Sequence, residues 1–539
     1  MEKTQNKVLC RVRDILKTSL DTAERECRLF WEYIRRNYLS LAVFSALYLL
    51  LFGSWLYHTN PRVDTDALIN VPNSYFNWEV IGRQFGVFTK YVFGLQWFDP
   101  QFAAFAGYFL FCVAGVLFGY LFWRCLREKG ALCAAFALAM FASPIMAEQY
   151  YFDMQIFEIA WAFILCAVSA GLTLYGAFRR RWFSLVLAAL ALLWSVGTYQ
   201  SFAFLYVALI AFCFMLLYRR YTVFKERTVS VGQYGAAAGL SVAVFAAAVI
   251  VYCVITYFWF SGNAYAQEQL RWFYDPLPHI RRIIGENMRE GFTGTGIYYT
   301  AFYGVFALLA AGVSVWDGVV SKNRFSLVYV AAAIFLQFVP FLLTVLFGGV
   351  KPVRSQFTYS FVLAADMLFL ASRPWKYKLH RACNFGTVFI VLAAVALFSQ
   401  LQVTARLVYT ENIRAQEDLR VATEIEEEIN RLSDLNKPVA FIGEYDQKLN
   451  NACYTPQHVY DGVTVIGYSV FNFFISRNDN YYENSNRICS FLQTVGFSFQ
   501  PISAELMAEA NVTAQSMPCW PQAGSVVDAG AYTVVKFSE

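Results

Sequence analysis

Long apolar blocks set the strongest limit on what this chain can fold into. Runs of roughly 18–25 mostly apolar residues recur between residues 38 and 405, and a run of this length crosses a bilayer core as one helix. The chain is 58% hydrophobic, whereas a soluble domain is about 45–50% apolar. We therefore predict an all-α polytopic membrane protein with about eleven spans. The predicted spans are residues 38–57, 102–123, 131–147, 156–177, 182–198, 201–218, 231–258, 298–318, 325–348, 356–372 and 384–405.

Lysine and arginine residues determine the predicted orientation, because short cytoplasmic loops retain them. These residues cluster in every second connection between spans, and the basic N-terminal segment falls on the same side. The clusters are RCLREK (124–129), FRRRW (178–182), RRYTVFKER (219–227), SKNR (321–324) and RPWKYKLHR (373–381). We expect a multi-pass protein of the inner or cytoplasmic membrane, with a cytoplasmic N-terminus and an extracytoplasmic C-terminus. The clusters form no continuous stripe, so no nucleic-acid partner is expected.

The chain divides into three predicted parts. Residues 1–37 form an amphipathic cytoplasmic helix, which either lies on the membrane surface or is an ordinary solvated helix. Residues 38–405 form the transmembrane part, with two long outer loops at 58–101 and 259–297. Residues 406–539 form a small extracytoplasmic α/β domain, because a charged helical pattern at 411–436 is followed by strand patterns at 437–444 and 531–539.

Carboxylates and cations gather on the predicted outer side. Asp64 and Asp66 flank Thr65 directly after the first span, and Glu148 and Asp153 lie in the second outer connection. Glu158 is predicted just inside a span, where an ionisable side chain indicates a function or a buried partner. The same reasoning applies to Asp366. Outer cations include Arg281, Arg282, Lys351 and Arg354.

This arrangement suits transfer from a lipid-phosphate donor to a hydroxyl acceptor. A carboxylate can accept the proton of the attacking hydroxyl, and arginine can bind the phosphate leaving group. The alternatives are ordinary ones: an outer aspartate is commonly solvated, D-x-D occurs by chance, and Arg354 also fits an interfacial anchor.

The sequence offers little sign of a cofactor. The four histidines are scattered, and no phosphate-binding glycine loop opens a helix. We expect no cofactor and no metal, although Asp64 and Asp66 would be the ligands if a divalent ion were used. Cys453, Cys489 and Cys519 lie in the tail and can form at most one disulfide.

Several short motifs resemble one membrane-enzyme family. The acidic pair is followed by Trp78, by Gly82-Arg83 and by QFGVFTKYVFGL. SPIMAEQYYFD, GTYQSFAFLYVAL with Tyr199-Gln200, and the ending MPCWPQAGSVVDAGAYTVVKFSE extend the likeness. The chain thus resembles the bacterial integral-membrane glucosyltransferases of the Gtr type, which modify O-antigen and have the GT-C fold.

The resemblance implies an inverting glycosyltransferase that moves glucose or another hexose from a polyprenyl-phosphate donor to a cell-surface glycan. An acid of the first outer loop would be the base, hence Asp66 or Asp64. Thr65 separates the two acids, and the arginine often found shortly after the family's pair is missing, so either aspartate fits.

The other site residues follow from this transfer hypothesis together with the charges on the predicted outer side. Arg83 would brace the loop or contact phosphate, and Tyr199 and Gln200 would contact substrate. Arg354, with Lys351 or one of Arg281 and Arg282, would hold the donor phosphate. Glu148 and Asp153 would bind sugar or acceptor hydroxyls.

Two other hypotheses remain open from the sequence. A lipid-linked glycan flippase or transporter would use the same charges along a pathway, but would need more charges deep in its spans. A non-catalytic assembly protein would depend on the tail. In the enzyme hypothesis the tail recognises the acceptor or caps the mouth of the site.

Overall fold

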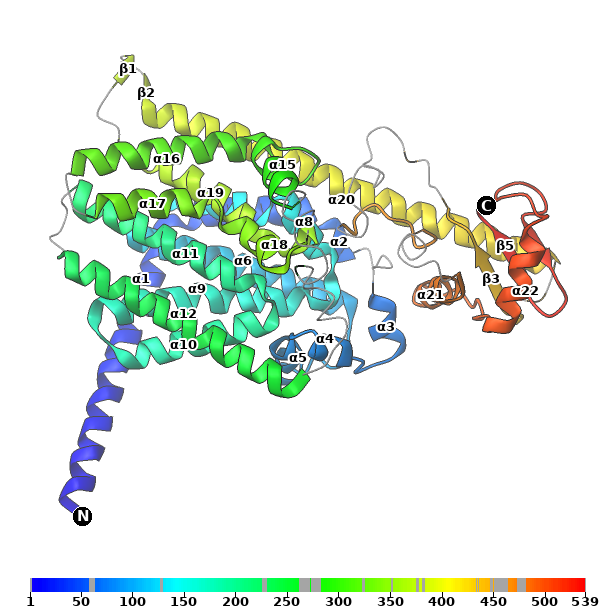
Figure 1. Ribbon diagram of the computed structural model, residues 1–539, viewed down its shortest axis with the longest axis horizontal. Coiled ribbons are helices and arrows are strands. Elements are labelled where there is room, and N and C mark those ends of the chain that lie inside the picture. The colour runs from blue at the N-terminus through cyan, green and yellow to red at the C-terminus, as the bar shows by residue number, and fades with distance from the viewer. Residues whose placement is uncertain are drawn as a thin grey trace.

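The computed structural model is a helical bundle joined to a small tail domain (Figure 1). It describes residues 2–57, 64–126, 129–224, 230–260, 272, 283–321, 325–349, 352–374, 378–380, 383–432, 434, 436–445, 449, 464–472 and 481–538. Arg281, Arg282, Lys351 and Cys453 lie outside them.

Six helices of the described chain are long and apolar enough to cross a membrane. They are α6 (Pro100–Leu126), α9 (Ile156–Arg179) with the preceding turn η1 (Asp153–Gln155), α11 (Ser201–Tyr218) continued by η2 (Arg219–Val223), α12 (Val231–Phe260), α16 (Ala301–Ser321) and α20 (Phe385–Leu432). The multi-pass prediction is therefore supported by these helices.

Two bent pairs raise the number of candidate spans to eight if each pair counts as one span. α7 (Gly130–Phe141) and α8 (Pro144–Tyr151) meet at 59°, and α17 (Ser326–Leu336) meets η5 (Val339–Phe341) and α18 (Leu342–Phe347) at 47°. Proline causes both bends, because it lacks the N–H that would continue a helix. Pro144 opens α8 behind the N-cap Ser143, whose hydroxyl accepts from the Met146 N–H, and Pro340 lies in η5.

Judged by length and composition, fewer helices of the described chain qualify as spans than the predicted number of about eleven. Helices occupy all eleven predicted ranges, but α10 (Trp182–Thr198) and α19 (Phe357–Ala371) are shorter apolar helices. The range 38–57 contains the end of α1 (Glu2–Phe52) and the short α2 (Ser54–Tyr57). α1 leaves helical geometry at Asn37, next to the predicted boundary of the N-terminal helix.

Short helices cover the end of the bundle where the tail begins. α3 (Thr65–Asn70), α4 (Phe76–Val80) and α5 (Gln84–Val92) come from the first long loop, and η4 (Ile283–Asn287) and α15 (Met288–Thr293) follow α12. The turn η6 (Val353–Ser355) precedes α19. The two-stranded hairpin of β1 (Lys378–His380) and β2 (Cys383–Asn384) lies at the opposite end, before α20 (Figure 1).

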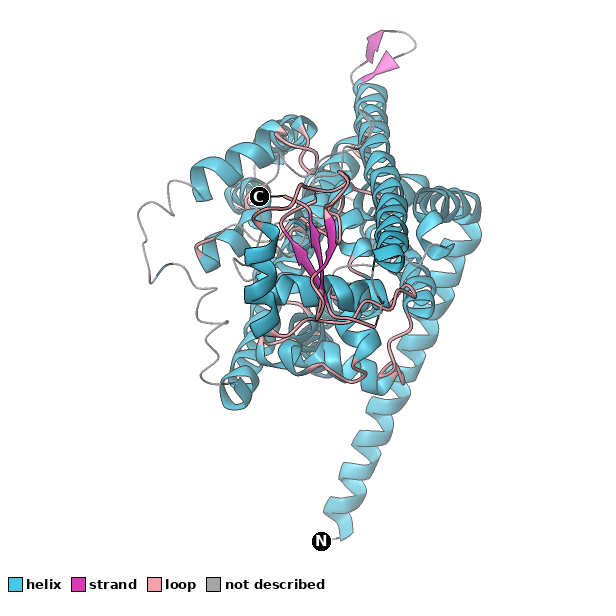
Figure 2. Ribbon diagram, turned by 90° about the vertical axis from the view of Figure 1, so that its right-hand side faces the viewer, coloured by secondary structure: helices cyan, strands magenta, loops and turns pink. Residues whose placement is uncertain are grey.

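The tail is the predicted small α/β fold. Its sheet has the order β3–β5–β4, with β3 (Val439–Ile442) parallel to β5 (Thr533–Lys536) and β4 (Val526–Asp528) antiparallel to β5. β3 and β5 confirm the two predicted strands. α21 (Tyr481–Gln493) and α22 (Ala504–Ala514) complete the domain, and Figure 2 shows its strands in front of the bundle. Cys489 and Cys519 are free thiols.

α20 physically links the bundle to the tail. This single helix continues through the boundary expected at residues 405 and 406, and Figure 1 shows it running from one part into the other. Val421, Ile425 and Ile429 near its end pack into the apolar core of the tail with β3 and α21. A continuous helix with a packed far end fixes where the tail lies against the bundle.

Candidate active site

The two aspartates of the first loop meet an arginine from the tail. Asp64 is the N-cap of α3 and Asp66 lies in the first turn of that helix. Arg487 of α21 donates through Nη2 to Asp64 Oδ1 at 2.9 Å and to Asp66 Oδ1 at 2.8 Å. Its Nε lies 2.8 Å from Asp66 Oδ2. One guanidinium thus bridges both carboxylates, a geometry that arginine's planar fork favours.

The two aspartates differ sharply in exposure. The Asp66 side chain is 2% exposed, whereas that of Asp64 is 45% exposed. Burial raises the pKa of Asp66 above the usual aspartate value, and the nearby charge of Arg487 opposes this effect. A second polar link lies alongside, where the Asn70 amide donates to the Ser490 carbonyl and hydroxyl oxygens at 3.0 and 2.9 Å.

Gly82-Arg83 turns the first loop back onto the bundle. Gly82 has φ +84°, a conformation that favours glycine, and a Cβ there would collide with the Tyr252 hydroxyl. Arg83 then donates to Gln155 Oε1 at 3.2 Å and lies 4.5 Å from the centre of the Tyr199 ring. Two predicted site residues, Arg83 and Tyr199, are therefore in contact with each other.

Gln200 completes this brace. Its amide donates to the Ile81 carbonyl at 2.9 Å and to the Tyr252 hydroxyl at 2.9 Å, while that hydroxyl donates to the Gly82 carbonyl at 3.1 Å. The start of α11 and the C-terminal part of α12 thereby hold the turn between α4 and α5. This geometry matches the bracing role among those considered for Arg83.

Glu158 has the buried partner that its position predicts. Lys90 of α5 lies 2.8 Å from Glu158 Oε1 and donates to the Met154 carbonyl at 2.9 Å. Both side chains are almost fully buried, so each charge depends on the other. The ion pair ties α5 to the start of α9. Asp366, the other interior acid, accepts from the Gln337 amide at 3.1 Å.

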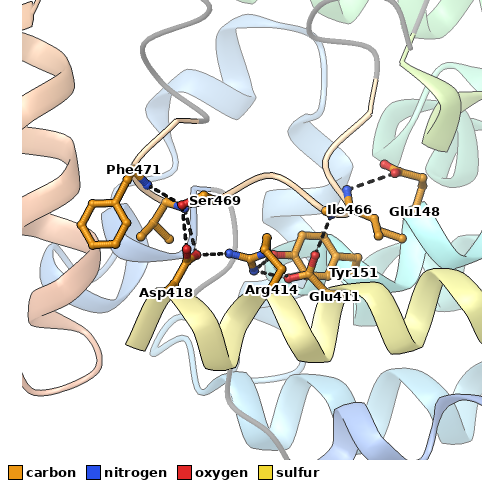
Figure 3. A network of polar contacts seen from close by, with 10 residues as sticks. Glu148, Tyr151, Glu411, Arg414, Asp418, Ile466, Ser469 and Phe471 are labelled. Atoms are coloured by element: carbon orange, nitrogen blue, oxygen red, sulfur yellow. Dashed lines mark hydrogen bonds and ion pairs between the residues drawn. The ribbon is translucent and has the colours of Figure 1, made fainter. Parts of the chain in front are cut away.

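Glu148 holds a segment of the tail rather than an open position. This fully buried carboxylate accepts from the Tyr298 hydroxyl, from the Val465 N–H at 2.9 Å and from the Ile466 N–H at 3.1 Å. Figure 3 shows residues 464–472, which we call the bridging segment, passing from Glu148 toward α20. The segment is fixed mainly by backbone N–H groups, so its side chains contribute little to these contacts.

α20 supplies a second set of buried charges to the bridging segment. Glu411, Arg414 and Asp418 occupy one helix face, where Arg414 pairs with both carboxylates and donates to the Tyr151 hydroxyl at 3.0 Å (Figure 3). Glu411 accepts from the Gly467 N–H at 2.8 Å.

Asp418 continues these contacts along the segment. It accepts from the Ser469 hydroxyl at 2.6 Å and from the Val470 N–H at 3.0 Å. Because α20 provides both carboxylates, the helix that links the bundle to the tail also fixes the bridging segment.

Arg354 is a half-buried cation with two unused donor atoms. It lies in η6, with its guanidinium carbon 4.4 Å from the centre of the Phe152 ring. Its Nε and Nη1 are buried without a hydrogen-bond partner, and its charge acts on nearby Glu148. Asp153 is buried at the start of η1. The remaining predicted phosphate ligands, Arg281, Arg282 and Lys351, lie outside the described residues.

The predicted residues form separate groups. Asp64 and Asp66 meet Arg487, Arg83 meets Tyr199 and Gln155, and Glu148 interacts with Arg354. Within the described ranges, no group of three or more His, Cys, Asp or Glu residues could hold a metal ion.

Three contributors were missed from the sequence. Arg487 lies 421 residues after Asp66, and no local pattern connects them. Lys90 lies in an amphipathic stretch, and no sequence pattern indicated that it pairs with Glu158. The Glu411–Arg414–Asp418 spacing places all three on one helix face, which was a usable signal, but a charged helix suggested solvent exposure.

Comparison with known proteins gives one result. A family model described as Glucosyl transferase GtrII matches residues 53–371. Neither the curated proteins nor the solved structures contain a match to this chain. The matched region contains the first loop, α8, α9 and η6, and it ends before α20 and the tail.

Proposed function

Because the chain belongs to the GtrII glucosyl transferase family, we propose that it is an inverting hexosyltransferase. The donor is a polyprenyl-phosphate-linked glucose or another hexose, and the acceptor is a hydroxyl of a cell-surface glycan. We place the reaction on the outer face of the inner or cytoplasmic membrane, with the N-terminus in the cytoplasm and the tail outside, as the distribution of lysine and arginine indicates.

The observation that carries the proposal is the acid pair at the tail-facing end of the bundle. A base for this reaction must be a carboxylate that an acceptor glycan can reach outside the lipid. Asp64 and Asp66 lie together on α3, outside the candidate spans, and Asp64 is partly exposed. Glu158, which lies at the start of a span, pairs with Lys90 instead of lining an open pathway, and this pairing disfavours the transporter alternative.

The transfer step follows from this placement. One aspartate of the pair accepts the proton of the acceptor hydroxyl as its oxygen attacks the anomeric carbon. The bond from that carbon to the phosphate oxygen breaks, its electron pair goes to the phosphate, and polyprenyl phosphate leaves. Attack from the face opposite the leaving group inverts the anomeric carbon.

Arg354 is the best-supported ligand for the leaving phosphate. The residue is half-buried, and its Nε and Nη1 are buried without a hydrogen-bond partner, so an anion that accepts from both atoms would stabilise it. We propose that Lys351 or one of Arg281 and Arg282 assists it. Arg83 and Gln200 hold the loop, and Tyr199 supports Arg83.

The two remaining acids receive different roles. Glu148 is occupied by Tyr298 and the bridging segment, so we propose that it fixes this segment close to Arg354. Asp153 keeps the proposed role in binding sugar or acceptor hydroxyls, because it begins η1 directly after α8, the helix that carries Glu148. The reaction as proposed needs no metal, and activity should survive a chelator.

A direct assay tests the function. The purified full-length protein in lipid nanodiscs is incubated with polyprenyl-phosphate glucose and glycan from cells that lack this protein. We expect the glycan to gain a hexose with inverted anomeric configuration, read by mass spectrometry and NMR. A product with retained configuration excludes the inverting mechanism, and the absence of any product with several hexose donors excludes the transfer itself.

A further inference from the structure

The backbone of Asp64 is held in an unusual conformation. Asp64 has φ +65°, one of only three such non-glycine residues in the described chain, the others being Asn73 and Arg180. This left-handed conformation is disfavoured for residues with a Cβ, and strained residues of this kind gather at functional sites.

Asp64 also forgoes the hydrogen bond that its position offers. An aspartate at an N-cap normally accepts from the N–H groups of the first helical turn, a bond worth about 1 kcal/mol. The Asp64 side chain makes no such bond, and Oδ1 accepts from Arg487 Nη2 instead. The carboxylate therefore points away from the helix, toward the tail domain and solvent.

Asp66 is engaged in a different way. Its Oδ1 accepts from Arg487 Nη2, and its Oδ2 lies 2.8 Å from Arg487 Nε. The side chain is almost completely buried. An acceptor hydroxyl cannot reach Asp66 while this pairing lasts. Asp64 contributes one oxygen to Arg487 and leaves almost half of its side chain exposed.

We infer that Asp64 is the catalytic base and that Asp66 and Arg487 are positioning residues, so that the tail domain completes the active site. The inference rests on the proposed inverting transfer. Asp66 fixes Arg487 through two contacts, and Arg487 Nη2 holds Asp64 Oδ1. Oδ2 of Asp64 is then directed to the acceptor, whose proton it takes as the bond to the anomeric carbon forms.

This assignment explains one difference between the first loop and the Gtr-type pattern. The sequence after the acid pair lacks a nearby arginine, and Arg487 supplies one from outside the region that matches the family. Asn70 and Ser490 strengthen the same contact between α3 and α21. Two elements more than 400 residues apart thus build one site.

Four variants test the assignment in the nanodisc assay: Asp64→Asn, Asp66→Asn, Arg487→Lys and Arg487→Gln. We expect Asp64→Asn to lower kcat by about 10²–10⁴-fold, the usual contribution of a general base, with KM for the donor and the melting temperature unchanged. Asp66→Asn should lower both the melting temperature and kcat, but kcat less than Asp64→Asn does. Arg487→Lys should retain more activity than Arg487→Gln, because it keeps the charge. Glu505→Gln, an exposed tail variant, is the control.

The outcomes separate the inference from the function on which it rests. If the wild-type protein transfers hexose but Asp64→Asn stays within tenfold of it, the base assignment is overturned and the transferase function stands. The assignment is equally overturned if Asp66→Asn loses more kcat than Asp64→Asn at an unchanged melting temperature. If the wild-type protein transfers no hexose, the proposed function fails, and the base assignment fails with it.

Discussion

The two ends of the helical bundle satisfy buried charge in opposite ways. At the end with the basic clusters, Arg219 and Arg373 share the single carboxylate of Asp317, at 2.9 and 2.7 Å. Here the cations are in surplus. Arg219 therefore also donates to the Phe369 carbonyl at 2.6 Å, in the last turn of α19, where cations are favourable.

At the tail-facing end the carboxylates are in surplus. Glu411 and Asp418 share Arg414, and Asp64 and Asp66 share Arg487. Backbone N–H groups of the bridging segment bind the surplus on α20, as backbone carbonyls bind the surplus cations at the other end.

Asp64 is the exception to this balance. Among the carboxylates of these three clusters in the described chain, Asp64 alone has a substantially exposed side chain. The other carboxylates of these clusters are buried against their arginines: Asp66, Asp317, Glu411 and Asp418. Incomplete satisfaction therefore marks the position where a substrate would complete the contacts.

The largest expected effect lies at the basic end. Asp317→Asn removes the buried carboxylate that Arg219 and Arg373 share, and removing one partner of a buried ion pair typically costs about 3–5 kcal/mol of unfolding free energy. Denaturant unfolding in detergent should show this loss. Transfer per folded molecule should match the wild-type protein, because the site lies at the other end. Lost activity in fully folded protein would contradict the division between the two ends.

At the tail-facing end, Glu411→Gln should have a smaller effect. The variant weakens a charge-assisted bond to Arg414 and one to the Gly467 N–H, so we expect a loss of about 1.5–3 kcal/mol. Glu424→Gln on the same helix is the matched control, because Glu424 forms an exposed pair with Arg420 that is worth about 0–1 kcal/mol. Equal losses in the two variants would mean that the bridging segment does not depend on Glu411.

The pH profile tests the acid pair itself. Burial raises the pKa of Asp66, and the positive charge of Arg487 opposes this increase. An acid with a raised pKa is protonated at a higher pH, so its contacts are lost earlier as the pH falls. Arg487→Gln should therefore move the acidic limb of kcat/KM to higher pH.

Two further variants show which group causes the shift in the pH profile. Lys437→Gln removes a tail cation that pairs with Asp528 and should leave the limb in place. In Asp66→Asn the displacement caused by Arg487→Gln should be smaller, because the buried carboxyl whose pKa Arg487 lowers is gone and only the contact with Asp64 is lost. A limb that moves equally in both backgrounds would assign the effect to another group.

The sequence predicted the features that local chemistry determines. Apolar blocks located the helices, and the strand patterns at 437–444 and 531–539 located β3 and β5. Glu158 was predicted to have a function or a buried partner, and the structure gives it Lys90 as a partner. The predicted number of about eleven spans was not confirmed, because Pro144 and Pro340 bend two segments and α10 and α19 are short.

The candidate site required the tertiary structure. Nothing within a sequence window relates Arg487 to Asp64, since the contact forms only when α20 carries the tail back against the first loop. Glu148 was predicted to bind substrate, and its burial by Val465 and Ile466 follows from the same path of the chain. Side chains that far apart meet through packing, which local propensity does not encode.

The smallest expected effect concerns how the tail is held. Asn70→Ala removes two hydrogen bonds to Ser490 at an exposed part of the α3–α21 contact, at a cost of about 0.5–1.5 kcal/mol. Transfer should stay within about twofold of the wild-type rate, because Arg487 still holds both aspartates. A melting curve and a kcat measurement on the same sample compare the two contacts. If Asn70→Ala impaired kcat as much as Arg487→Gln, the position of the tail as a whole would matter, and the guanidinium would lose its special role.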